Sequence, residues 1–148
     1  MHRKMRKFIL NLMRHHNVTR IATVRRDGYP QATTVAYAND GLTLYFACDR
    51  DSQKVRNLAH SKKVSLTIDR DCADWNKIKG LSMAATARVL REPAEIRRGL
   101  RLLARKFPAM AEMSKEDLAA TAVVMVTPKM ISVIDYAKGF GHAELVRV

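Results

Sequence analysis

The junction at residues 42–58, where an apolar strand leads into a helix, has the residue types to bind a phosphate. Ser52 stands where a helix N-cap belongs, and the first helical turn carries N–H groups without intrahelical acceptors at the positive end of the dipole. Such a turn binds anions. Lys54 can add an ammonium group there, and Arg50 or Arg56 a second charge. We interpret the junction as a phosphate-binding turn, and an ordinary capped helix with a solvated lysine is the alternative.

The net charge of the chain favours an anionic partner. Lys and Arg number 27 against 14 Asp and Glu, which gives +13 at pH 7. A basic surface attracts polyanions, and it would equally suit a small phosphorylated ligand. No helix-turn-helix, zinc-finger or basic-plus-aromatic pattern accompanies the charge. Nucleic acid therefore ranks behind a small molecule as the expected partner.

The sequence gives little indication of a metal site, a catalytic nucleophile or a membrane segment. Cys48 and Cys72 lie in different predicted elements without metal-ligand spacing, so we expect reduced thiols and no metal site. There is no nucleophile triad and no carboxylate pair, and we assign no catalytic residue. No apolar run approaches the roughly 18 residues of a membrane span, and the N-terminus is too basic for a signal peptide. We expect a soluble, cytoplasmic protein whose single domain spans residues 1–148.

The elements that position the junction follow from hydrophobic periodicity. A stripe of apolar residues predicts an N-terminal helix within residues 1–17, and turn signals at Asp27-Gly28 and Asn39-Asp40-Gly41 predict a three-stranded meander. The meander leads into the helix that Ser52 caps. The predicted strands cover residues 20–26, 31–38, 42–48, 63–69 and 80–91.

The C-terminal half combines helices with further strands. An amphipathic helix is predicted at 94–107, and Ser114 with Asp117 resembles a capping box. Two apolar strands are expected at 122–127 and 130–136, separated by Pro128, which should mark a corner or a sheet edge because it cannot donate to a ladder. Residues 137–148 are expected to form a tail tied down at an interface. These elements predict a mostly β fold with α additions, an antiparallel barrel.

The order of these elements resembles a known family. The stretch RIATVRRDGYPQATTVAYANDGLTLYFACDRDSQKVRNLAHSKKVSLTID is similar to the core of the FMN-binding split-barrel family related to pyridoxamine 5'-phosphate oxidase. The likeness covers about residues 18–137 and is most specific where SQKVRNL precedes KKVSLTI, which resembles the family's phosphate turn and following strand. The resemblance implies a six-stranded antiparallel split β-barrel and a homodimer with two FMN sites at its interface.

The resemblance also implies a set of cofactor-binding residues. Ser52 and Lys54 match the residues that bind the FMN phosphate, and Gln53 stands where the family often has Arg. Ala47 and Cys48 match the end of the third strand against the flavin ring, and the strand at 80–91 would bring a residue from the other subunit. The remaining matches are Thr33, Thr34, Val35 and Tyr37 along the ribityl chain and ring, and Ser82 as the residue from the partner.

The implied function is that of an FMN flavoprotein, an oxidoreductase or reductase acting on an unknown small molecule, with NAD(P)H as one candidate reductant. The oxidase itself carries a C-terminal segment with Trp, Arg and His that grips pyridoxine phosphate, and nothing like it follows here, so oxidation of pyridoxamine phosphate is not expected. The alternatives are a deazaflavin-dependent reductase, a non-enzymatic flavin or haem module in which His60 or His142 binds iron, and a polyanion-binding module. Gly139 and Gly141 would let Phe140 and His142 close over the flavin of a partner, although we favour the tied-down tail.

Overall fold

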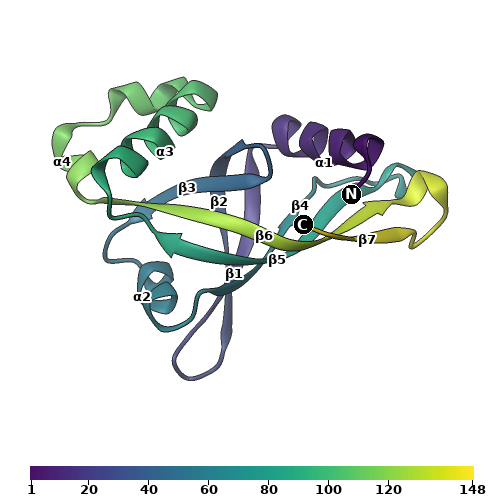
Figure 1. The fold of residues 1–148 in the computed structure, drawn as a ribbon, viewed down its shortest axis with the longest axis horizontal. Helices are drawn as coiled ribbons and strands as arrows, with labels where there is room; N and C mark the ends of the chain where they lie inside the picture. Colours follow the sequence, from purple (N-terminus) through teal and green to yellow (C-terminus); the bar gives the residue numbers. More distant parts are fainter.

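The computed structural model describes all of residues 1–148, and its seven strands form one antiparallel sheet that closes on itself. Six strands follow the order β3-β2-β1-β4-β5-β6, and pairing of β3 with β6 completes the barrel, while β7 lies outside on β6 (Figure 1). This confirms the predicted six-stranded split barrel. The strands are β1 (Val18–Val24), β2 (Pro30–Asp40), β3 (Thr43–Asp49), β4 (Lys63–Ile68), β5 (Lys79–Val89), β6 (Thr121–Asp135) and β7 (Ala143–Arg147).

The helices lie around the barrel. Three short 3₁₀ turns join the elements, and none of the helices has the length and apolar character that a membrane crossing requires. The capping box at Ser114 is present, since the side chains of Ser114 and Asp117 each accept the other's backbone N–H. The helical segments are α1 (Arg3–His15), α2 (Gln53–His60), α3 (Pro93–Lys106) and α4 (Lys115–Ala119), with η1 (Trp75–Lys77), η2 (Pro108–Glu112) and η3 (Tyr136–Lys138).

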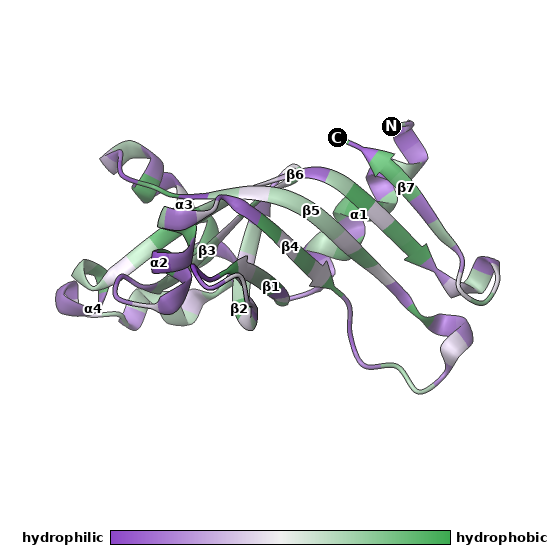
Figure 2. Ribbon diagram, turned by 90° about the horizontal axis from the view of Figure 1, so that it is seen from below, coloured by the Kyte–Doolittle hydropathy of each residue, from purple (hydrophilic) through white to green (hydrophobic).

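The core fills the barrel and continues under α1. Alternate strand residues point inward, as the mixed colours along the strands in Figure 2 indicate, and the apolar stripe of α1 packs on the same cluster. α3 packs instead on the outer face of β3 and β6 through a second small cluster around Tyr45 and Val123. The largest fully buried side chains include Tyr37, Phe46, Ile9, Met13 and Ile21.

The two strands predicted on either side of Pro128 are one continuous strand, β6. Pro128 pairs with Ala85 while Met130 pairs with Ala84, so Lys129 is an extra residue at a bulge. On its other side β6 pairs with β3 up to Val126 and with β7 only from Met130. Pro128 therefore lies at a local sheet edge, as predicted, but it does not end the strand.

The predicted C-terminal tail contains regular structure. β7 pairs with residues 130–134 of β6, and η3 contacts η1, where Phe140 lies between Trp75 and Tyr136 with ring centroids 5.7 and 5.3 Å away. Phe140 keeps 76% of its surface exposed. This end of the molecule lies opposite α2 (Figure 1).

Candidate functional site

β2 and β3 are paired along only part of their lengths. Their register runs from Tyr37 opposite Phe46 to Asp40 opposite Thr43. Residues 30–36 of β2 pair only with β1, and residues 47–49 of β3 pair only with β6. The two strands therefore diverge, and their facing edges have no ladder partner.

Alternation along the strands identifies the main-chain groups on these edges. The Tyr37 N–H donates to the Asn17 carbonyl at 3.2 Å, so Tyr37 directs its main chain toward β1. Successive residues direct their N–H and C=O groups to opposite edges of a strand, so Thr34 and Ala36 face the gap. Ala47 faces it from β3, because Tyr45, two residues earlier, faces β2. We call the main chain of Thr34, Ala36 and Ala47 the open edge.

Helix α2 begins beside the open edge. Ser52 is its N-cap, and the Ser52 hydroxyl accepts the Val55 N–H at 3.4 Å. The first intrahelical bond joins the Arg56 N–H to the Ser52 carbonyl, which leaves the N–H groups of Gln53 and Lys54 without an intrahelical acceptor. The first turn of α2 carries no acidic side chain. The predicted turn therefore has two free main-chain donors at a helix N-terminus, the kind of group that can bind an anion.

Lys54 and Cys48 lie close to the Ser52 cap. The Ser52 hydroxyl donates to the Cys48 sulfur at 3.6 Å, and the half-buried Lys54 makes no ion pair. Burial raises the pKa of the Cys48 thiol, and the Ser52 hydrogen bond and the Lys54 charge oppose this only in part. Cys48 is therefore a neutral thiol at physiological pH, and Lys54 offers an uncommitted cation.

The Gln53 side chain is hydrogen-bonded within the protein. Its Nε2 donates to Asn57 Oδ1 at 2.8 Å, and its Oε1 accepts from Arg56 at 2.9 Å. Asn57, only 1% exposed, donates in turn to Thr23 Oγ1 at 2.9 Å and to Gln31 Oε1 at 3.0 Å. This network fixes α2 to β1 and β2, so both ends of the Gln53 amide are occupied, and Arg50 remains as the second unengaged cation.

The predicted residues of β2 divide between the two faces of the strand. Val35 and Tyr37 are buried in the core, and the Tyr37 hydroxyl donates to the Met13 carbonyl at 2.6 Å. The Thr33 hydroxyl is also buried and has no hydrogen-bond partner. Thr34 is exposed on the outer face. The residue missed from sequence is Ala36, which alternation relative to a buried Tyr37 would have identified.

Ser82 lies away from the open edge. It is exposed on the outer face of β5, paired with Thr67 on β4 and Ser132 on β6. Strands β1 and β4 separate it from β2. Within one chain Ser82 does not join the other predicted residues, and its expected role involves the partner subunit.

A cavity of 460 Å³ adjoins the open edge. Its floor comes from the middle of β2, the end of β3 and the start of β6, and its wall comes from α3 and η2, which the sequence did not assign to the site. The apolar spacing of three residues from Phe107 through Met113 was the available signal. The lining residues are Ala36, Ala47, Cys48, Asp49, Leu103, Phe107, Met110, Met113 and Thr121.

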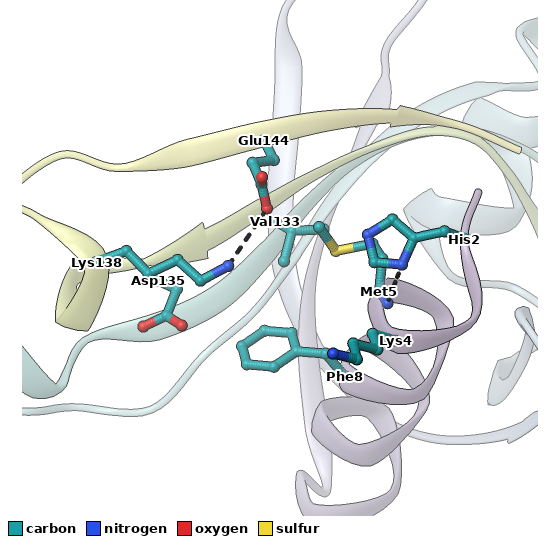
Figure 3. A pocket seen from close by; sticks show the side chains of 8 residues that line it. All are labelled: His2, Lys4, Met5, Phe8, Val133, Asp135, Lys138 and Glu144. Atoms are coloured by element: carbon teal, nitrogen blue, oxygen red, sulfur yellow. Dashed lines mark hydrogen bonds and ion pairs between the residues drawn. The ribbon is translucent and has the colours of Figure 1, made fainter.

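A second cavity of 240 Å³ lies between α1 and the β6–β7 end of the sheet (Figure 3). Two of its charged groups pair with each other, since Lys138 lies 3.7 Å from Glu144, and His2 accepts the Met5 N–H at 3.4 Å. None of the predicted site residues lines it. The open edge, the turn of α2 and the adjoining cavity bring together the predicted residues Ala47, Cys48, Ser52 and Lys54, and we take them as the candidate site.

Comparisons with known proteins agree with this fold. Residues 1–135 match the family model described as pyridoxamine 5'-phosphate oxidase. General stress protein 26 of Bacillus subtilis is 28% identical over 64 residues, 43% of this chain and 45% of that protein. The structure of general stress protein 26 from Bacillus anthracis covers 99% of this chain and 100% of its own, with 16% identity and a TM-score of 0.74. A haem-binding protein from Mycobacterium smegmatis has a TM-score of 0.81 and 18% identity, covering 99% of this chain and 59% of its own.

Proposed function

This chain belongs to the pyridoxamine 5'-phosphate oxidase family, and from that premise we propose that it binds FMN at the open edge and acts as an FMN-dependent oxidoreductase on a small molecule. The observation that supports this most directly is the divergence of β2 and β3 beside the N-terminus of α2. An unpaired main-chain edge and a helix N-terminus that could bind an anion lie next to each other there. The first would match the ring of FMN and the second its phosphate.

The open edge fits the ring of FMN. The pyrimidine part of a flavin presents hydrogen-bond donors and acceptors in one plane, and a strand edge presents N–H and C=O groups in one plane. Unpaired main-chain groups gain stability from such a partner. Thr34, Ala36 and Ala47 are the residues whose main chain would hold the ring, and small side chains at two of them leave room for it.

The turn of α2 fits the phosphate. The N–H groups of Gln53 and Lys54 would donate to the phosphate oxygens, and the Lys54 ammonium would balance their charge. The exposed Arg50 could add a second cation. Gln53 would contribute its main chain only, because its side chain is held by Asn57 and Arg56.

Bound FMN would supply the transfer of a hydride or of electrons, and the chain would hold and orient it. This division accords with a site that offers no activated nucleophile, since the Cys48 thiol stays neutral. NAD(P)H is one candidate reductant. The proposed assembly is a homodimer, in which Ser82 would reach the flavin of the partner.

FMN and riboflavin together provide the test, because riboflavin has the same ring without the phosphate. Removing the Lys54 charge deletes a charge-assisted contact worth about 1.5–3 kcal/mol, so Lys54→Met should weaken FMN binding roughly 10- to 100-fold and leave riboflavin binding unchanged. Flavin fluorescence quenching measures both affinities. Lys62→Met, at an exposed lysine beyond the other end of α2, is the matched control. Equal losses for FMN and riboflavin would contradict the phosphate assignment.

Haem is the second candidate, because the Mycobacterium smegmatis protein with the same fold binds it. Of the two candidate ligands, His60 is exposed at the last turn of α2, and the His142 Nε2 is buried without a partner. α2, which ends at His60, and the start of β7, which follows His142, lie at opposite ends of the molecule (Figure 1), so a single chain could use only one of the two histidines. A Soret band on haem addition that FMN does not displace would favour haem over FMN. A deazaflavin would instead be retained through the same open edge, with its acidic tail on the basic surface.

A further inference from the structure

We infer that the 460 Å³ cavity beside the open edge takes an uncharged, largely apolar ring compound and rejects phosphorylated ones. As a substrate site this rests on the proposed FMN function, since the cavity would then lie beside the flavin. Three properties of the cavity determine the chemistry of its ligand: its walls, its charge and its position.

The walls are apolar and adaptable. In the wall, Leu103 is buried, and Phe107, Met110 and Met113 are half-buried. Methionine side chains are flexible and polarisable and contact aromatic rings favourably. The volume lies within the range of small-molecule sites, which is about 300–1,000 Å³. A ring compound of one or two fused rings meets these requirements.

The charge around the cavity excludes anions. The chain has 27 Lys and Arg residues, yet none of them lines this cavity. The only charged lining residue is Asp49, whose carboxylate accepts the Asp51 N–H at 2.7 Å. The Thr121 hydroxyl is also committed, donating to the Asp117 carbonyl at 2.7 Å. A phosphate or carboxylate here would lose its hydration without gaining a cation and would face the Asp49 carboxylate.

The position makes the cavity continuous with the proposed flavin site. Ala36 and Ala47 both line the cavity, and both direct their main chain to the open edge. A ligand in the cavity would therefore contact the same two residues that hold the ring. This continuity favours a substrate over an unrelated ligand.

A matched pair of probes tests the inference: 2-naphthol and 2-naphthyl phosphate, measured by calorimetry at neutral pH on the protein with and without FMN. We expect 2-naphthol to bind, and 2-naphthyl phosphate to bind at least tenfold more weakly. Met113→Gln keeps the length of the side chain but makes the wall polar, so it should weaken 2-naphthol about tenfold and leave FMN affinity unchanged. Leu118→Gln on α4, which is exposed and does not line the cavity, is the control. Phe107→Leu is a second variant that keeps the wall apolar but removes the ring, and it should also weaken 2-naphthol.

The outcomes separate this inference from the cofactor proposal. Binding of 2-naphthol that depends on Met113 supports the cavity assignment even if FMN fails to bind, in which case the cofactor proposal alone falls. FMN binding without 2-naphthol binding overturns the inference alone. Tighter binding of 2-naphthyl phosphate than of 2-naphthol would also overturn the inference. Variants that change self-association instead of 2-naphthol binding would overturn it too, because the cavity would then be an interface between copies of the chain.

Discussion

At the scale of single residues, Tyr37 connects three parts of the molecule. Its hydroxyl donates to the Met13 carbonyl in α1 at 2.6 Å, and the Lys106 ammonium of α3 lies 4.1 Å from its ring centroid. Lys106 also donates to the His16 carbonyl at 2.6 Å, at the negative end of the α1 dipole. The side chain that the family resemblance assigns to the flavin therefore holds α1 and α3 on the barrel.

Tyr37 should make the stability of the protein fall at alkaline pH. Burial raises the pKa of Tyr37, so above about pH 10 the folded protein retains a proton that the unfolded chain has released. The free energy of unfolding contributed by this group is complete below about pH 10 and declines as the pH rises further. Tyr37→Phe should remove this part of the decline while costing about 1 kcal/mol at neutral pH. Urea unfolding at several pH values measures both effects.

Tyr29 provides the matched control for this pH dependence, since it is 71% exposed. Tyr29→Phe should leave the alkaline decline as it is in the wild-type protein. Both variants keep the ring at the substituted position, so the Lys106 ammonium keeps an aromatic face in all three proteins. Parallel losses of stability in the wild type and Tyr37→Phe would show that the buried hydroxyl is not responsible.

At the scale of elements, Gly99 sets how closely α3 approaches the barrel. A Cβ at this position would lie 2.8 Å from Val123 Cγ1 and 3.3 Å from Tyr45 Cδ1. Gly99→Ala gains about 1 kcal/mol of helix propensity but meets a steric cost of about 1–3 kcal/mol, so we expect a net loss of up to about 2 kcal/mol in denaturant unfolding. Ala104→Gly on the exposed face of α3 measures the propensity alone. A stabilised Gly99→Ala would contradict the close packing.

The elements also show what the sequence could and could not predict. Period-two alternation located the barrel strands, and the Ser52 and Ser114 caps were identified because capping depends on local residues. The predicted strand break at Pro128 was wrong, since a bulge keeps β6 continuous. The bulge depends on pairing with β5, which local sequence does not reveal. Val35 and Tyr37 were assigned from the family resemblance, and Ala36 was missed because alternation in β2 indicates two faces without indicating which one lies inside. The wall at η2 was missed because it consists of one short turn.

At the scale of the whole molecule, the two ends of the barrel carry different elements. α2 and the adjoining open edge lie at one end, and η3 with the start of β7 lies at the other (Figure 1). Phe140 lies at the η3 end, with its ring centroid 5.3 Å from that of Tyr136. Phe140 and His142 could therefore reach a site at an open edge only in a second copy of the chain. Between the ends, a row of small side chains crosses four neighbouring strands on the outer face of the sheet: Ala32, Ala22, Ser65 and Ala84.

We expect this row of small residues to form the homodimer interface, because two copies that each carry +13 need close contact over a flat face to associate. A stable interface buries about 800 Å² per partner, and a single bulky charge at its centre prevents close approach. Ala84→Arg should therefore convert a dimer to a monomer in sedimentation equilibrium and weaken FMN binding at least tenfold. Ala104→Arg, which adds the same charge on the exposed face of α3, should change neither property. A wild-type monomer would contradict the homodimer, and an Ala84→Arg dimer with unchanged FMN affinity would place the interface elsewhere. Either result would leave Ser82 without its expected role.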